Sequence, residues 1–392
     1  MIDQIRLGDF RINSEAKHKI AEVLKSGRIS YGPMSGRFEK RFAELHGCRY
    51  GVVSNSGTSS LVVAVQALKE LNNWQDGDEV LVPAITFVAS VNAVIHCRLT
   101  PVLVDVEPSD FTINVMKMED ALTERTVAIM PVHPFGLPAD MNYICEFAQA
   151  HNLKIIEDSC ECMAVGINEK RVGSWGDVGC FSTYVAHIMT TGVGGMATTN
   201  DKELALKMRS LVNHGIETMS LPSPDGYDPS HLSRQFRFTS IGHSFRITEL
   251  EAALGLSQMD DIESWIESRQ ENAIYLRNAL RDLVEQERIR LQQEDFYSGV
   301  EHAYMVFPIV LESFPKQALM QHLRRNNIEC RDLLPLTNQP CYEEMFDPLD
   351  YPEAHFLNQC GLYIPCHQFL SAEDLDKMIR AIYDFFDDIP IR

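Results

Sequence analysis

The sequence lacks the features that would place it in a membrane or on nucleic acid. Its 392 residues contain no apolar run approaching the roughly 18–20 residues that a membrane-spanning helix needs. Its formal net charge of −20 leaves no excess of basic residues for binding nucleic acid or anionic lipid. The first residues do not have the layout of a signal peptide. We therefore expect a soluble, cytoplasmic protein with neither nucleic acid nor membrane as a partner.

The sequence also lacks an arrangement of cysteines that would bind metal. Ten cysteines are spread along the chain, and the only close pair is Cys160 and Cys162. This pair is not CxxC, and no second pair completes a zinc site. In a cytoplasmic protein such cysteines are reduced and pack as small apolar residues. The sequence therefore predicts no metal site.

The length and the hydrophobic pattern predict an α/β protein of two domains. In the first half, short apolar runs of strand length alternate with helical stretches, which favours a mostly parallel sheet covered on both faces. Residues 14–26 have helical spacing with Ser14 as a plausible N-cap. A long helical stretch over 248–286 connects to a second part with fewer strands. We expect a large α/β domain over 1–255 and a small α+β domain over 256–392.

Three segments could carry chemistry, and each also has an ordinary structural interpretation. Residues 54–61 predict a strand, a Ser/Gly/Thr turn and a helix start, which is either an anion site or a simple N-cap. Asp158 ends a predicted buried strand, where it either faces a ligand or caps the following turn. In 176–200, small and hydroxyl residues surround the single imidazole of His187, which alone is more typical of a hydrogen-bonded core residue. The segment 219–237 is rich in Pro, Ser, Asp and Gly and predicts a loop.

Taken together, these segments resemble a known family in their order and spacing. Further matching motifs are RISYGPMSGRFEKRFAE, PAITFVAS, LVNHG, LLPLTNQPCY and YIPCHQFLSAEDLDKMI. The resemblance is to the DegT/DnrJ/EryC1/StrS group of nucleotide-sugar enzymes, which depend on pyridoxal 5′-phosphate (PLP). It covers nearly the whole chain. It implies the aspartate aminotransferase-like fold and a homodimer whose cofactor sites are shared between subunits.

The resemblance implies a role for each matching residue. Phe87 stacks on the cofactor's pyridine ring, Asp158 pairs with the ring nitrogen, and Glu161 lies near the 3-hydroxyl. Gly57, Thr58 and Ser182 bind the cofactor phosphate. Ser244 stands where a residue of the family reaches the partner subunit's cofactor phosphate. His187 falls where aminotransferases of the family have their cofactor-binding lysine.

A histidine at position 187 changes the implied chemistry. Imidazole cannot form a Schiff base, so PLP or its amine form, pyridoxamine 5′-phosphate (PMP), must bind without a covalent bond. This resembles the branch of PMP-dependent 3-dehydratases that act on 4-keto-6-deoxy nucleotide sugars. There, the histidine moves a proton at the cofactor's C4′ while the sugar loses its C3 hydroxyl. Glutamate is the expected donor that regenerates PMP, and O-antigen synthesis is the family-level pathway. An iron–sulfur version is rejected, because no cysteine lies between Cys180 and Cys330.

Three departures from the family pattern keep two alternatives open. Ser244 replaces the asparagine of G-x-N-x-R, Val193 replaces the glutamate of TTGEGG, and Ile188 stands where a second histidine is common in the dehydratases. The first alternative is a non-catalytic or regulatory homologue that binds a nucleotide sugar or a partner. The second is an aminotransferase that uses another lysine, for which Lys170 is the candidate.

Overall fold

The computed structural model describes residues 4–217, 236–293, 299–334 and 336–387. The loop predicted at 219–237 lies outside the described residues except for its last two positions. Within the described residues, no helix is long and apolar enough to cross a membrane.

A seven-stranded sheet in the order β1-β9-β8-β5-β4-β2-β3 forms the centre of the larger part of the molecule. Its strands are β1 (Tyr50–Ser54), β2 (Glu79–Pro83), β3 (Thr100–Val104), β4 (Thr126–Ile129), β5 (Lys154–Asp158), β8 (Val178–Ser182) and β9 (Gly195–Thr199). Among the described strands of this sheet, β9 is antiparallel to both neighbours and the other pairs are parallel. The mostly parallel sheet predicted from the sequence is therefore confirmed.

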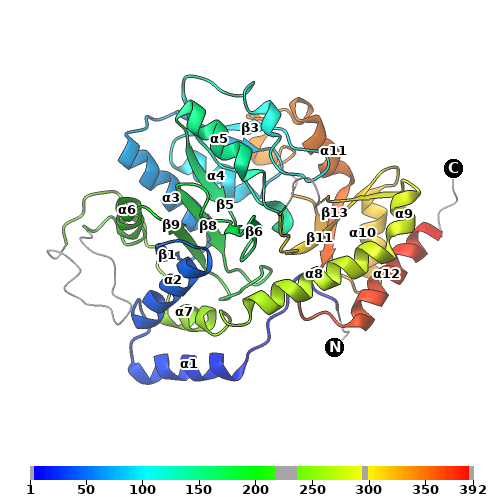
Figure 1. The fold of residues 1–392 in the computed structure, drawn as a ribbon, viewed down its shortest axis with the longest axis horizontal. Coiled ribbons are helices and arrows are strands. Elements are labelled where there is room, and N and C mark those ends of the chain that lie inside the picture. Colours follow the sequence, from blue (N-terminus) through cyan, green and yellow to red (C-terminus); the bar gives the residue numbers. More distant parts are fainter. Residues whose placement is uncertain (1–3, 218–235, 294–298, 335, 388–392) are drawn as a thin grey trace.

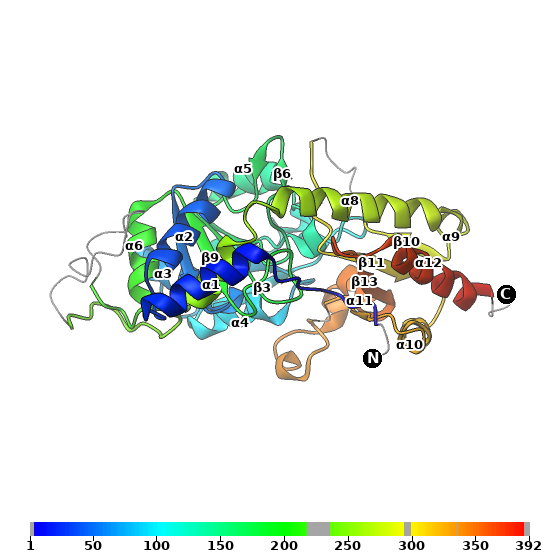
Figure 2. The ribbon, with the colours of Figure 1, turned by 90° about the horizontal axis from the view of Figure 1, so that it is seen from below.

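Helices cover both faces of this sheet (Figures 1 and 2). They are α2 (Pro33–Leu45), α3 (Gly57–Asn72), α4 (Val88–His96), α5 (Met141–His151) and α6 (Lys202–Val212), whereas α1 (Ser14–Ser26) packs on α7 (Glu249–Leu256). The strands are buried almost throughout, as expected for a sheet covered on both sides. α3 packs against β8 and β9, so its first turn lies beside the end of β8. A small hairpin of β6 (Gly166–Ile167) and β7 (Lys170–Arg171) follows β5.

The smaller part contains an antiparallel four-stranded sheet in the order β10-β11-β13-β12. Its elements are β10 (Ile289–Leu291), β11 (Val306–Leu311), β12 (Arg331–Asp332), β13 (Gly361–Pro365), α9 (Arg281–Glu285), α10 (Lys316–Arg325), α11 (Pro352–Cys360) and α12 (Ala372–Asp387). α12 buries one apolar stripe, including Leu375, Met378 and Ile382, in a core separate from that of the main sheet. The α/β fold class is confirmed, whereas the division at residue 255 stays a prediction.

The structure corrects two details of the sequence reading. The N-cap of α1 is Asn13, whose side chain accepts the Ala16 N–H, and not Ser14. The stretch 248–286 is also not one helix: it is divided into α7 (Glu249–Leu256), α8 (Ile262–Ala279) and α9. The helix breaks after α7, where the Gln258 side chain bonds the backbone N–H and C=O of Thr190. A tertiary contact thus ends a helix that local propensity would have continued.

Candidate active site

A cavity of about 340 Å³ lies at the ends of the main-sheet strands, between them and the smaller part. Seven of the eight residues predicted for the site line it: Gly57, Thr58, Phe87, Asp158, Glu161, Ser182 and His187. Ser244 does not line it. Ser244 is exposed, and its hydroxyl accepts a hydrogen bond from Arg246 at 3.0 Å. The structure therefore brings seven of the predicted residues together in one cavity, while the roles given to all eight stay predictions.

Asp158 is placed in the cavity by the end of β5. Its side chain is buried, with 5% of the residue exposed. The Ser90 hydroxyl donates to Oδ2 at 2.6 Å, and the Cys160 N–H donates to Oδ1 at 3.1 Å. An ionised carboxylate can accept about four hydrogen bonds, so Asp158 keeps acceptor capacity for a positively charged ligand group.

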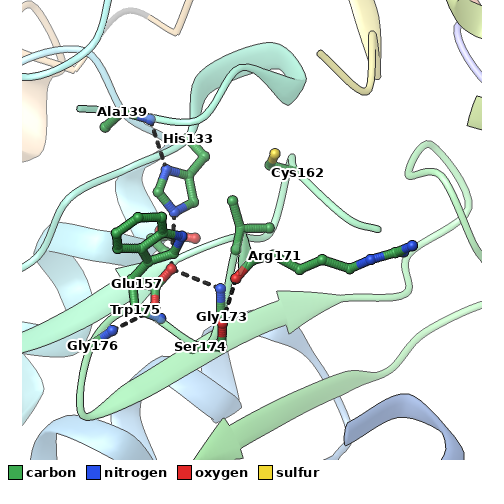
Figure 3. Close-up of polar contacts among 12 residues, drawn as sticks. His133, Ala139, Glu157, Cys162, Arg171, Gly173, Ser174, Trp175 and Gly176 are labelled. Atoms are coloured by element: carbon green, nitrogen blue, oxygen red, sulfur yellow. Dashed lines mark hydrogen bonds and ion pairs between the residues drawn. The ribbon is translucent and has the colours of Figure 1, made fainter. Parts of the chain in front are cut away.

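The adjacent Glu157 points to the opposite face of the same strand, since side chains alternate along a strand. Figure 3 shows its carboxylate held by the loop that follows β7. It accepts the N–H groups of Gly173, Trp175 and Gly176 at 2.7, 2.7 and 2.8 Å. The ring of His133 lies 3.3 Å away, with its other nitrogen 3.0 Å from the Ala139 N–H (Figure 3). Glu157 is therefore a saturated, fully buried anchor.

The turn before α3 forms a cradle of backbone N–H groups beside Ser182. Ser56 is the N-cap, and its hydroxyl accepts the Ser59 N–H at 3.0 Å. In the described part of the chain no group accepts from the N–H of Gly57 or Thr58. A Cβ on Gly57 would lie only 2.7 Å from the Ser182 Cβ, so only glycine lets the two segments approach. Ser56 therefore caps the helix, as one interpretation of the sequence expected. The anion site stays a prediction, and the free N–H donors of Gly57 and Thr58 would fit a phosphate.

A loop between β8 and β9 presents His187 to the cavity. The hydroxyls of Thr183 and Thr191 bond each other at 2.6 Å, which pins the two ends of this loop together. Ile188 and Met189 are buried in the main core, whereas His187 remains partly accessible. The position of the imidazole is therefore fixed by the residues around it in sequence.

His187 differs from an ordinary core histidine in its hydrogen bonding. Its Nδ1 is buried and has no hydrogen-bond partner among the described residues. Burial lowers the pKa of His187 to about 4, although the nearby backbone carbonyls of Cys160 and Ser182 act to raise it. Neither carbonyl forms a well-aligned hydrogen bond with Nδ1. The ring is therefore neutral at pH 7, and it offers an unused nitrogen for accepting a proton.

Glu161 lies beside Asp158 at the wall of the cavity. Its Oε2 accepts the N–H of Phe135 at 2.8 Å. Burial raises the pKa of Glu161 to about 7, against the effect of the Phe135 N–H and with a further contribution from Asp158. Near neutral pH this carboxyl can therefore donate a proton to an oxygen acceptor.

Phe87 stands at the start of α4 with its ring open to solvent. It is 60% exposed, although it is a large apolar side chain at the edge of a cavity. A ring in this position is available as a flat surface for another ring to stack on.

Sequence reasoning missed the residues that the smaller part and the N-terminus contribute to the cavity. These are Leu7, Met305, Val306, Arg331, Leu334 and Tyr363, with Tyr184 from the His187 loop. The motif that contains Tyr363 was recognised, but no local pattern shows that it faces a site more than 150 residues away in the chain. Tyr184 also packs edge-on against His187, with ring centroids 6.2 Å apart.

The residues present fit the cofactor that the resemblance implies. The free N–H groups of Gly57 and Thr58 suit a phosphate, the exposed Phe87 ring suits a pyridine ring, and Asp158 suits a protonated ring nitrogen. The imidazole of His187 lines the same cavity, where it can give or take a proton.

No lysine lines the cavity within the described part of the chain. Lys170 lies in β7, with its ammonium group 4.1 Å from the centre of the Trp175 ring. It borders a separate surface hollow, together with Glu169 and Arg171. Lys170 is therefore held away from the cavity.

Comparison with known proteins agrees with this architecture. The chain is 33% identical over 378 residues to GDP-perosamine synthase of Caulobacter vibrioides, covering 95% of each chain. It is 28% identical over 382 residues to GDP-4-keto-6-deoxy-D-mannose 3-dehydratase of Yersinia pseudotuberculosis, covering 93% of each. The solved aminotransferase of Psychrobacter cryohalolentis superposes with a TM-score of 0.86 at 27% identity, covering 97% of this chain and 98% of the other.

The profile of one family matches residues 11–383 of the chain. The match confirms the aspartate aminotransferase-like fold expected from the sequence, and it confirms PLP as the cofactor of the family. The protein belongs to the DegT/DnrJ/EryC1/StrS aminotransferase family.

Proposed function

We propose that this protein is a PLP/PMP-dependent dehydratase that removes the C3 hydroxyl of a nucleotide-linked 4-keto-6-deoxy sugar. The observation that carries the proposal is a neutral imidazole, His187, in a cavity with Asp158 and Ser182 where an aminotransferase needs a lysine. The similarity to a GDP-4-keto-6-deoxy-D-mannose 3-dehydratase supports the same reaction class.

The cofactor, when bound, supplies an electron-accepting ring that stabilises negative charge on the carbon attached to it. In this chain Gly57, Thr58 and Ser182 hold its phosphate, and Phe87 stacks on its ring. Asp158 keeps the ring nitrogen protonated, because its carboxylate retains unused acceptor capacity. Glu161 bonds the oxygen at ring position 3. All of these contacts are non-covalent.

His187 acts as the proton-transferring base at the cofactor's C4′. Its lowered pKa keeps the ring neutral at pH 7, so one of its two nitrogens carries no proton and can accept one, and the loop holds the ring in place. Imidazole has no primary amine, so His187 cannot bind PLP covalently. A lysine here would release and recapture the cofactor and so favour transamination. Its replacement leaves proton transfer as the main role of the position.

An aminotransferase is the second candidate, because GDP-perosamine synthase shows the higher identity of 33%. This candidate needs an amine near the cofactor. The described cavity contains none, and Lys170 lies on the Trp175 ring. We therefore place it behind the dehydratase. A homologue without catalysis is third, and the intact set of cavity residues disfavours it.

We propose that two copies of the chain pair to complete the site. Large apolar side chains are exposed around the cavity and the segment before α7, including Phe87, Phe238 and Ile241, the last of which is 90% exposed. Ser244 lies in the same segment, where it would reach the partner's cofactor phosphate. Exposed apolar side chains of this kind suit a surface covered by a partner, and a second copy is the partner that the resemblance implies.

The experiment that tests the function uses protein loaded with PMP. Mixing it with GDP- or CDP-linked 4-keto-6-deoxyhexose is expected to give a 3-deoxy-4-keto sugar, together with a change in cofactor absorbance. Adding L-glutamate should allow repeated turnover. An amino sugar as the main product would favour the aminotransferase, and failure to bind either PLP or PMP would favour the non-catalytic homologue.

A further inference from the structure

One side chain gives the cavity a positive charge. Among the described residues that line the cavity, Arg331 is the one lysine or arginine, in a chain whose net charge is −20. It lies on β12, at the edge of the smaller sheet that faces the cavity. The other charged groups of the lining are Asp158 and Glu161. An anionic ligand entering this cavity therefore has Arg331 as its available partner.

Two tyrosines connect Arg331 to the reactive side of the cavity. Tyr363 lies next to Arg331 on β13, where its pKa is raised by burial and then by Glu161, while Arg331 lowers it. Tyr184 lies close enough to interact with Arg331, and its ring packs edge-on against His187. Arg331 and His187 therefore share Tyr184 as a neighbour, and Arg331 and Glu161 share Tyr363.

The present partner of Arg331 is easily exchanged. Its Nη2 lies 3.1 Å from Oε1 of Glu329, and 53% of the arginine side chain is exposed. Such exposed pairs add little stability. The second oxygen of Glu329 accepts the Leu7 N–H, so Glu329 stays in place without the arginine. An incoming carboxylate that offers both oxygens to the guanidinium fork would form the stronger pair.

The position of Arg331 distinguishes between two possible anions. In an amino acid, the α-carboxylate is attached directly to the carbon that reacts. In a nucleotide-linked 4-keto sugar, the diphosphate is attached at C1, across the ring from the reacting C4 and C3. Because Arg331 lines the same cavity as His187, we expect it to pair with a carboxylate held beside the reacting carbon and not with a diphosphate held across the sugar.

We propose that Arg331 binds the carboxylate of the amino-acid donor, L-glutamate, that regenerates PMP in this cavity. This assignment rests on the proposed function and adds its donor site. In the reaction, the amino nitrogen leaves the Cα of glutamate and the carbonyl oxygen leaves C4′ of PLP. The proton and electron pair of the Cα–H bond end on C4′. Glutamate is oxidised to 2-oxoglutarate, PLP is reduced to PMP, and no net water is consumed.

The test separates the two half-reactions of the full-length protein. The PLP-loaded protein is mixed with L-glutamate, and PMP formation is followed by absorbance. The PMP-loaded protein is mixed with the 4-keto sugar in a second arm. Arg331→Gln is expected to raise the half-saturating glutamate concentration roughly 10–100-fold, because a charge-assisted bidentate pair is lost. Arg331→Lys should raise it less, since lysine keeps the charge without the fork.

Binding without turnover gives an independent measurement. Calorimetric titration of the PLP-loaded protein with glutarate, which has neither an amine nor a ketone and cannot react, is expected to show the same loss of affinity in Arg331→Gln. The matched control is Arg325→Gln at the exposed end of α10, which does not line the cavity and should behave as the wild type. In the sugar arm, Arg331→Gln should lose clearly less than in the glutamate arm, whereas Arg325→Gln should match the wild type in both.

Other results would overturn the assignment of Arg331 to glutamate, or would reject the dehydratase function independently of that assignment. An unchanged glutamate response in Arg331→Gln overturns it, as does a wild type that forms no PMP from glutamate. An equal or larger loss in the sugar arm assigns Arg331 to the sugar's diphosphate instead. A wild type that accepts glutamate through Arg331 but leaves the sugar undehydrated supports the donor site and rejects the dehydratase.

Discussion

Glu157 and Asp158 are consecutive carboxylates on one strand, yet their surroundings differ completely. Glu157 faces the interior and accepts three backbone N–H groups, with His133 beside it (Figure 3). Asp158 faces the cavity and accepts only from Ser90 and Cys160. A saturated carboxylate stabilises the fold, whereas one with spare acceptor capacity is available to a ligand.

The two histidines repeat the same contrast. Both ring nitrogens of His133 have partners, Glu157 and the Ala139 N–H. His187 has a buried Nδ1 with no partner in the described residues. In both of these pairs, the member that lines the cavity is the one with unused hydrogen-bonding capacity. The following variants test each side of it.

The largest expected effect is the loss of dehydration rate when His187, whose Nδ1 has no hydrogen-bond partner in the described residues, is replaced. His187→Asn should lower the dehydration rate about 10²–10⁴-fold, since it removes the proton-transferring group. Its thermal unfolding should match that of the wild type, because no hydrogen bond of good geometry is lost. Rapid-mixing assays and calorimetric unfolding measure the two quantities. A variant that retains full activity would remove His187 from the mechanism.

The saturated carboxylate should act on stability instead. Glu157→Gln is expected to lower the free energy of unfolding by about 3 kcal/mol, since an amide N–H would then face backbone N–H groups in a dry interior. Denaturant unfolding measures this. The rate per folded molecule should change little at temperatures where the variant is folded. A strong loss of rate with unchanged stability would reverse the roles given to the two neighbours.

The adjacent carboxylate provides the matched experiment. Asp158→Asn should lower the rate about 100-fold, equivalent to about 2.7 kcal/mol in the barrier, because the ring nitrogen loses its anionic partner. Its unfolding free energy without cofactor should fall by less than about 1 kcal/mol, since the Ser90 hydroxyl can still bond an amide oxygen. Equal stability losses in Glu157→Gln and Asp158→Asn would break the comparison.

The smallest expected effect concerns pH and Glu161. Because its pKa in the fold is about 7 and its ordinary value is 4.5, ionisation disfavours the folded state. This loss of stability is absent below pH 4.5, grows as the pH rises and is complete above about 7. Between these limits the wild type should lose about 2 kcal/mol of stability relative to Glu161→Gln, less than the roughly 3 kcal/mol equivalent of the full shift, because Glu161 is partly exposed to the open cavity. Unfolding curves at several pH values compare the two. Parallel pH dependences would show that Glu161 is not protonated in the fold.

The sequence could predict the elements and the residues that local patterns mark. The alternation of short apolar runs predicted the parallel sheet, and the end of one such run placed Asp158 at its edge. Glu157 was not recognised as an anchor, although a glutamate inside the run KIIED is a signal in itself. Its partners, 173–176 and His133, come from loops whose conformation depends on the tertiary fold.

The rest depends on contacts between distant segments. Arg331 and Tyr363 reach the cavity because β12 and β13 belong to a second sheet that packs across the ends of the first. The break after α7 depends on Gln258 bonding Thr190. Both contacts join segments far apart in sequence, and no periodicity within one segment reports them.

The most direct test of the central claim asks whether any amine reaches the cofactor. Protein incubated with PLP is reduced with borohydride, digested and mapped by mass spectrometry, with His187→Lys as the positive control. The account predicts no labelled peptide in the wild type and a label at position 187 in the variant. A labelled lysine in the wild type would contradict it, since an amine and not an imidazole would then face the reacting carbon.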